Sequence, residues 1–145
     1  MSQRIRRPSK IKGVIVPPGD KSISQRAVLL NSIAFGEATI SNYSTGQDAT
    51  SMIQGLKRLG ANICFSQPDN DPDKQPILII NGNGSESLKE PIRILDAGNS
   101  GTALRLLTGL MAAQPFFGII TGDQSLKSRP MTRVVEPLSQ MGATI

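Results

Sequence analysis

The sequence predicts an α/β (α+β) protein built from a repeated unit in which strands and helices alternate. Three observations support this fold class. Short apolar runs bounded by Gly, Pro and Asn alternate with segments of helical periodicity, a strand-to-helix turn occurs twice, and long stretches match one another about 80 residues apart. The length of 145 residues suits a single domain.

The first part of the chain contains the clearest elements. In order, we predict a strand at 11–19 stopped by two prolines, a helix at 23–35 ended by Gly36, a strand at 37–42, a helix closed by Gly60, and strands at 61–65, 77–81 and 92–95, with a hairpin loop at 66–76. Ser22 and Gln25 have capping-box spacing, which predicts that Ser22 starts the first helix. The second helix has an apolar face of Ala49, Met52, Ile53, Leu56 and Leu59.

The pattern then starts again. Residues 19–26 match residues 98–105 at a spacing of 79 positions, and residues 53–63 match residues 135–145 at a spacing of 82. Between these two matches, the second unit is therefore three residues longer than the first. Its pattern stops within or at the end of its third element, so we expect a complete unit from 20 to about 95 and part of a second from about 96 to 145.

Composition argues against several classes of function. The formal net charge of +5 comes from five bases within residues 1–12, and beyond them 11 bases balance 11 acids. With one Tyr, four Phe and no Trp, stacking platforms for nucleic acid are few, so we expect no nucleic-acid partner. No apolar run suits a membrane helix and the start lacks a secretory segment, which predicts a cytoplasmic protein. Cys64 is the single cysteine and histidine is absent, so we predict a buried structural thiol and no metal site.

The candidate chemistry lies where the two helices of the repeat begin. A helix N-terminus has unpaired N–H groups and a partial positive charge, which favour an anion such as phosphate. At the first helix, Lys21, Ser22 and Arg26 add an ammonium, a hydroxyl and a guanidinium. At the second, the stretch GNSGT supplies Asn99, Gly101 and Thr102, and glycine lets the backbone approach a ligand closely. This stretch lacks the lysine of a P-loop, so nucleotide binding has no support.

Each residue also has a purely structural interpretation. Ser22 or Asn99 alone could be a helix N-cap, and Lys21 alone could be a solvated surface charge. In the stretch TGDQSLKSRPMTR, the bases Lys127, Arg129 and Arg133 could simply line a solvated loop before a helix that Pro130 helps to start.

Three stretches together resemble a known family. PPGDKSISQRA, DAGNSGTALRLLTGL and GDQSLKSRPM are similar, in order and spacing, to motifs of the EPSP synthases, or 3-phosphoshikimate 1-carboxyvinyltransferases. The resemblance runs from about Ile11 to Ile145 but covers only about the first third of a family member. The related enolpyruvyl transferase that acts on UDP-N-acetylglucosamine shares the fold without the D-K-S-x-S-x-R signature, which favours the shikimate-pathway family.

The resemblance implies a transferase that moves the enolpyruvyl group of phosphoenolpyruvate to the 5-hydroxyl of shikimate 3-phosphate without a cofactor or metal. It implies that Lys21 contacts both substrates and is catalytic, and that Ser22 and Arg26 hold the shikimate 3-phosphate. It assigns phosphoenolpyruvate to Lys21 and to Asn99, Gly101, Thr102 and Arg129. The inhibitor glyphosate, which competes for the phosphoenolpyruvate site, would meet Gly101.

The resemblance also implies an inside-out fold of two lobes, each made of three βαβαββ units. Residues 1–19 would then be a tail and strand that pack with the second lobe, and residues 20–145 would be an incomplete first lobe. The acidic residues that handle protons belong to later parts of such a chain, so we expect this polypeptide to be inactive alone. The alternative is a non-catalytic module that binds the ligands. Faces made for absent neighbours should expose apolar surface and cause association or partial disorder.

Overall fold

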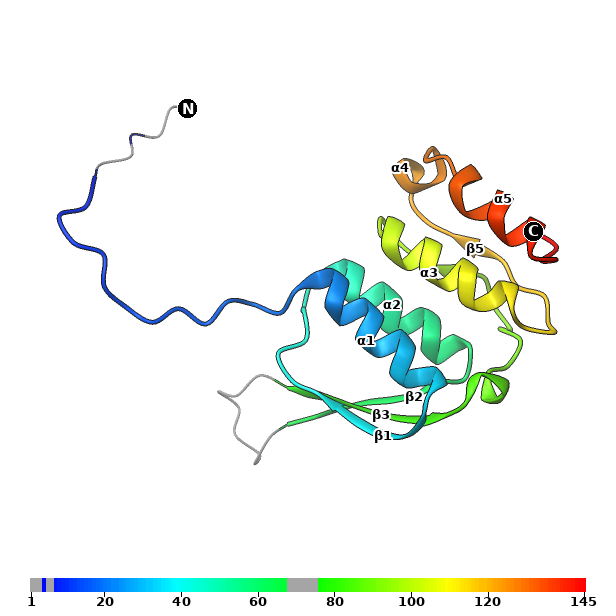
Figure 1. Cartoon of the computed structure of the whole chain (residues 1–145), viewed down its shortest axis with the longest axis horizontal. Helices are drawn as coiled ribbons and strands as arrows, with labels where there is room; N and C mark the ends of the chain where they lie inside the picture. Colours follow the sequence, from blue (N-terminus) through cyan, green and yellow to red (C-terminus); the bar gives the residue numbers. More distant parts are fainter. Residues whose placement is uncertain (1–3, 5–6, 68–75) are drawn as a thin grey trace.

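The computed structural model describes residue 4 and residues 7–67 and 76–145. The helices are α1 (Lys21–Ile33), α2 (Gln47–Arg58), α3 (Gly101–Ala112), α4 (Gln124–Lys127) and α5 (Thr132–Gln140), with a 3-10 helix η2 (Ser85–Ser87). The strands are β1 (Phe35–Ile40), β2 (Asn62–Ser66), β3 (Ile77–Asn83), β4 (Leu95–Asp96) and β5 (Ile120–Thr121). Helices α1, α2 and α3 lie between a three-stranded sheet and a strand pair, and α4 and α5 lie at the outside of the molecule beyond β5 (Figure 1). The predicted mixture of strands and helices is confirmed.

Two small sheets lie on either side of α1, α2 and α3. The first is antiparallel in the order β1-β3-β2, so that Ile80 of β3 lies between Ala38 of β1 and Ile63 of β2. The second is the parallel pair β4-β5, with Leu95 opposite Ile120. Helices α1 and α2 pack on the first sheet, and α3 packs on α2 and on β5. A parallel pair needs a crossover between its strands, and α3 is that crossover.

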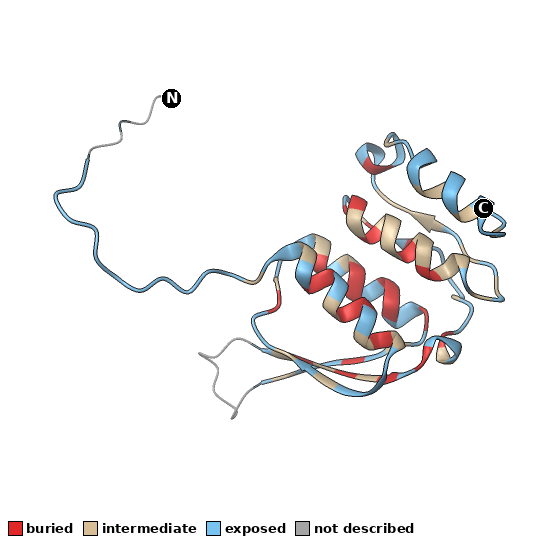
Figure 2. Cartoon of the chain, viewed as in Figure 1, coloured by how far each residue is buried: buried red, intermediate tan, exposed pale blue. Residues whose placement is uncertain are grey.

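The core lies between these layers (Figure 2). The predicted apolar face of the second helix is confirmed, since Ala49, Met52, Ile53, Leu56 and Leu59 are all buried. On the sheet side of the core, β3 contributes Leu78 and Ile80. The residues that alternate with them, Ile77 and Ile79, are only half-buried because successive side chains of a strand point to opposite faces. From the other side, α3 contributes Leu107.

The start of α1 differs from the prediction. The helix begins at Lys21 and its N-cap is Asp20, whose Oδ1 accepts a hydrogen bond from the backbone N–H of Ile23 at 2.7 Å. Ser22 lies within the first turn, so the predicted capping box is wrong. The physical reason is that Gln25, its expected partner, is buried against α2 and α3 and does not reach back to the helix start.

The C-terminal ends of α2 and α5, which match in the sequence repeat, also have the same backbone structure. After α2, Gly60 has φ of 91° and the N–H of Ala61 donates to the carbonyl of Leu56 at 3.0 Å. After α5, 82 positions later, Gly142 has φ of 99° and the N–H of Ala143 donates to the carbonyl of Leu138 at 3.0 Å. Both ends are Schellman motifs, in which glycine adopts the left-handed conformation without steric strain. Gly36, in contrast, lies inside β1, and α1 ends earlier, at Ile33.

Three other predictions need correction or fall outside the structure. Cys64 is exposed, not buried, because it lies on β2 next to the buried Ile63 and so faces the other side of the sheet. The strand predicted at 92–95 is paired only at Leu95–Asp96. Most of the predicted hairpin loop, residues 68–75, lies outside the described residues.

No strand forms within residues 11–19, although the sequence predicts one there. This segment extends away from the helices (Figure 1), and its side chains Ile11, Val14, Ile15 and Val16 are between 83% and 96% exposed. A strand needs a neighbouring strand to satisfy its backbone groups, and no strand of the described residues pairs with this segment. That the segment packs with a second lobe stays a prediction.

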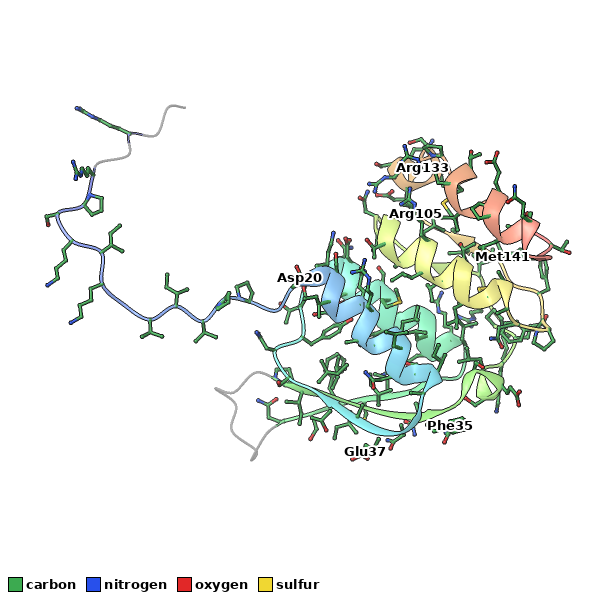
Figure 3. The ribbon with its side chains drawn as sticks, viewed as in Figure 1. Asp20, Phe35, Glu37, Arg105, Arg133 and Met141 are labelled. Atoms are coloured by element: carbon green, nitrogen blue, oxygen red, sulfur yellow. The ribbon has the colours of Figure 1, made fainter. Side chains whose placement is uncertain are left out.

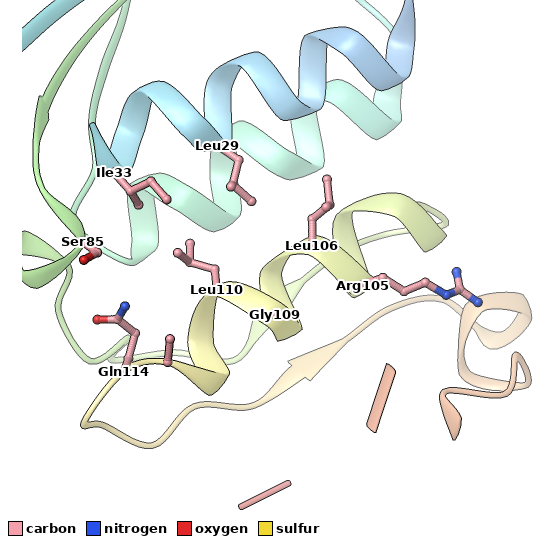
Figure 4. Close-up of a pocket in the computed structure, with 9 residues that line it drawn as sticks. Leu29, Ile33, Ser85, Arg105, Leu106, Gly109, Leu110 and Gln114 are labelled. Atoms are coloured by element: carbon pink, nitrogen blue, oxygen red, sulfur yellow. The ribbon is translucent and has the colours of Figure 1, made fainter. Parts of the chain in front are cut away.

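Apolar side chains also line a groove between α1 and α3. Leu29 and Ile33 of α1 face Leu106 and Leu110 of α3 across a groove of about 420 Å³ (Figure 4). In α5, which is described throughout, no residue is buried. Such faces fit the predicted association, which stays a prediction. Within the described ranges, no helix is long and apolar enough to cross a membrane.

Candidate active site

The N-termini of α1, α2 and α3 meet on one side of the molecule (Figure 1). Gln25 joins them, since its Nε2 donates to the backbone carbonyl of Asp48 in the first turn of α2 at 2.8 Å and to Oγ of Ser100 at 3.0 Å. Ser100 is the N-cap of α3 and accepts from the N–H of Ala103 at 3.1 Å. Three positive helix ends thus face the same region, which favours anions.

The first cluster lies on the opening turns of α1, and we call Lys21, Ser22 and Arg26 the α1 site. Lys21 is about half exposed, and its Nζ lies 2.9 Å from Oδ2 of Asp48 in an ion pair. Arg26 is exposed, and its Nη1 donates to the main-chain oxygen of Ser22 at 3.2 Å. The structure therefore places the three predicted residues within the first two turns of α1.

The second cluster surrounds the start of α3, and we call Asn99, Gly101, Thr102, Arg105 and Arg129 the α3 site. Gly101 is the first residue of α3 and is buried. A Cβ at Gly101 would lie 2.7 Å from Nη1 of Arg105 and 3.0 Å from Nη1 of Arg129. Two guanidinium groups from different elements thus lie against the space that this glycine leaves open. Thr102, the next residue of α3, is half-buried.

Asn99 links Arg129 to an acidic residue. Nη2 of Arg129 donates to Oδ1 of Asn99 at 2.9 Å, and Nδ2 of Asn99 donates to a carboxylate oxygen of Asp123. The hydrogen bond from Asn99, the backbone N–H of Leu126 and the charge of Arg129 together hold the pKa of Asp123 below its ordinary value. Asp123 is therefore ionised at neutral pH, and its chain of contacts fixes the direction of the Arg129 guanidinium.

The three bases predicted as one segment behave differently. Lys127 and Arg133 are exposed, and Arg133 lies at the end of the molecule that carries α4 (Figure 3). Arg129 is half-buried and reaches both Asn99 and the open side of Gly101. Lys127 ends the short helix α4 and Arg133 lies in α5, so both are solvent-exposed residues of helices and not of a loop. Arg129 lies between these two helices, against Gly101, and its role in ligand binding stays a prediction.

Arg105 is a site residue that the sequence analysis missed, although a signal for it existed. It lies 79 positions after Arg26, at the same place in the repeat. Nη1 of Arg105 donates to the main-chain oxygen of Gly101 at 3.0 Å, four residues earlier, as Arg26 does to Ser22. Asp48 was also missed, and no local pattern marks it, because its contact with Lys21 joins two helices.

Comparison with known proteins identifies the family of this chain. The family model for EPSP synthase (3-phosphoshikimate 1-carboxyvinyltransferase) matches residues 5–145. The chain belongs to the EPSP synthase family. It is 47% identical over 135 residues to the 3-phosphoshikimate 1-carboxyvinyltransferase of Pelotomaculum thermopropionicum, covering 93% of this chain and 30% of that protein. The protein of the same name from Chloroflexus aurantiacus is 49% identical over 138 residues, covering 95% of this chain and 30% of that protein.

Solved EPSP synthases have the same fold. The enzyme from Acinetobacter baumannii superimposes with a TM-score of 0.80 at 39% identity, covering 91% of this chain and 28% of that chain. The expected α/β fold of the EPSP synthases is thereby confirmed. The chain spans about 30% of the length of the curated relatives it matches, so these 145 residues correspond to one portion of an EPSP synthase.

Proposed function

We infer that this chain is part of an enzyme that transfers the enolpyruvyl group of phosphoenolpyruvate to the 5-hydroxyl of shikimate 3-phosphate and releases phosphate. The observation that carries the proposal is the meeting of two cationic clusters at adjoining helix N-termini, tied together by Gln25. Two acidic metabolites that must react with one another need two such sites side by side. Membership of the EPSP synthase family supports the same reaction.

In this proposal the α1 site binds the 3-phosphate of shikimate 3-phosphate. The hydroxyl of Ser22 and the guanidinium of Arg26 donate to phosphate oxygens, and a guanidinium offers forked donors that match them. Lys21 contacts both substrates. Its ammonium pairs with Asp48 in this structure. A bound ligand therefore either replaces Asp48 as the partner of Lys21 or shares Lys21 with it.

The α3 site binds phosphoenolpyruvate. Arg129 and Asn99 supply donors, Thr102 is a close neighbour, and the backbone at Gly101 approaches the ligand where a side chain would obstruct it. Arg105 adds a second guanidinium on the same side. Glyphosate competes at this site and contacts the open face of Gly101.

The chemistry follows from these charges. The 5-hydroxyl attacks C2 of phosphoenolpyruvate while C3 takes a proton, and the tetrahedral adduct then loses phosphate. Negative charge develops on the reacting groups and the leaving phosphate, and Lys21 and the arginines stabilise it once the cleft is closed and dry. In this proposal the acidic groups that move protons are supplied by other parts of the complete enzyme.

The described residues form one side of such a cleft. Residues 20–145 belong to the first lobe in this proposal, and residues 1–19 pack with the second. Because one side of a cleft neither excludes water nor positions both reactants, these 145 residues alone are inactive. The alternative is a module that binds either substrate without turnover. It predicts that the full-length protein binds substrate but releases no phosphate.

The test measures phosphate release and substrate binding by the full-length protein. Lys21→Met and Arg129→Ala each remove a charged donor, which is worth about 1.5–3 kcal/mol, so substrate capture should fall by about 10- to 150-fold. Lys127→Met and Arg133→Ala are matched controls, because both side chains are exposed and lie outside the two sites. Unchanged capture by Lys21→Met and Arg129→Ala would contradict the proposal, and binding without phosphate release would favour the module.

A further inference from the structure

Gln25 is a fully buried amide, with 0% of its surface exposed, at the point where three helices meet. Its Nε2 makes both of its hydrogen bonds across helix boundaries, to the carbonyl of Asp48 and to Oγ of Ser100. Reversing the amide would set Oε1 against the Asp48 carbonyl, which is also an acceptor, so the nitrogen faces Asp48. Ser100 is 75 residues away in the chain.

The buried amide of Gln25 lowers the stability of the fold. Its Oε1 is buried and has no hydrogen-bond partner among the described residues, and an unsatisfied buried acceptor lowers stability. The repeat shows that the fold does not require it, because the matching position of the second unit, 79 residues later, is Leu104. Leu104 packs against the core as an apolar residue. The polar side chain thus occurs in the unit where it can bridge α1 to α3.

The bridge connects the residues next to the two sites. Gln25 directly precedes Arg26 and lies one turn after Lys21, so its anchoring fixes the turn of α1 that carries the α1 site. Ser100 directly precedes Gly101, so its hydroxyl fixes the start of α3. A hydrogen bond between Gln25 and Ser100 therefore sets the position of one site relative to the other.

We propose that Gln25 is a positioning residue that holds the α1 and α3 sites at the separation needed for reaction between their two bound substrates. The inference rests on the proposed function. Gln25 touches neither substrate and acts through Ser100 and Asp48. Its loss should leave each site able to bind its own ligand, whereas turnover should fall, because displacement of reacting groups by about 1 Å can lower the rate by about 100-fold.

The experiment uses the full-length protein with Gln25→Met, which keeps the volume of the side chain and removes its donors. Leu104→Met is the control, since it places the same residue at the matching position of the repeat, where no hydrogen bond is lost. We expect kcat of Gln25→Met to fall by about 10- to 100-fold, with the affinities for shikimate 3-phosphate alone and phosphoenolpyruvate alone within about threefold of wild type. Its melting temperature should be unchanged or higher, and Leu104→Met should retain wild-type kcat.

Three results would overturn the inference. A kcat within about threefold of wild type would remove the positioning role and leave the proposed function intact. Gln25 would be a residue of the fold alone if both Gln25→Met and Gln25→Leu failed to fold. The same conclusion would follow if both variants lost their affinity for each substrate measured alone. Absence of phosphate release from the wild-type protein would overturn the proposed function, and this inference with it.

Discussion

Gly101→Ala should separate ligand binding from folding. The added Cβ would lie 2.7 Å from Nη1 of Arg105 and 3.0 Å from Nη1 of Arg129, whereas ordinary contact begins at 3.4 Å. Both atoms end flexible side chains, so the two guanidinium groups can move away by several tenths of an ångström. The backbone of Gly101 is helical, where alanine is tolerated without strain. The free energy of unfolding should therefore change by less than about 1 kcal/mol.

Binding should respond much more strongly than folding. A methyl group on the ligand side of α3 displaces Arg105 and Arg129 and narrows the space for phosphoenolpyruvate or glyphosate. Loss of one charge-assisted hydrogen bond is worth about 1.5–3 kcal/mol, or about a 10- to 150-fold weaker affinity. The affinity for shikimate 3-phosphate alone should stay close to wild type, because the α1 site is unchanged.

Calorimetric titration of the full-length protein and its denaturant unfolding would measure both effects. Gly109→Ala is a matched control eight residues further along α3, because its Cβ would have no atom within 4 Å. That variant should gain about 0.5–1 kcal/mol of stability from helix propensity and bind both ligands as wild type does. Equal affinity of wild type and Gly101→Ala for glyphosate and phosphoenolpyruvate would refute the assignment of this glycine to the site.

Two further predictions concern stability. Gly55→Ala should lower the free energy of unfolding by about 1–3 kcal/mol, since its Cβ would lie 2.7 Å from Cδ1 of the buried Leu107, and denaturant unfolding would show this loss. Burial raises the pKa of Tyr43, whose hydroxyl donates to the carbonyl of Ala49 at 3.1 Å. The unfolded state therefore loses its proton first, so stability should be complete below about pH 10 and decline above it, while Tyr43→Phe should lack this contribution to the alkaline decline. An identical pH dependence in both proteins would contradict the assignment.

The elements from α1 to β3 could be predicted from the sequence because their signals are local, whereas the strand predicted at 11–19 does not form. The apolar face from Ala49 to Leu59 follows from helical spacing, and the helix end at Gly60 follows from the freedom of glycine at positive φ. The repeat placed two helix starts in equivalent positions, and the motifs at Lys21, Asn99 and Arg129 led to the family that the comparisons show.

The sequence by itself therefore determined the fold class, the repeat and the two regions in which α1 and α3 begin. Only the tertiary structure decided that Asp20 caps α1, that Gln25 turns inward, that Cys64 faces outward, and that Arg105 and Arg129 meet at Gly101. The physical reason is distance along the chain. Periodicity and capping act within a few residues, whereas contacts such as that of Gln25 with Ser100 exist only after helices 75 positions apart have packed together.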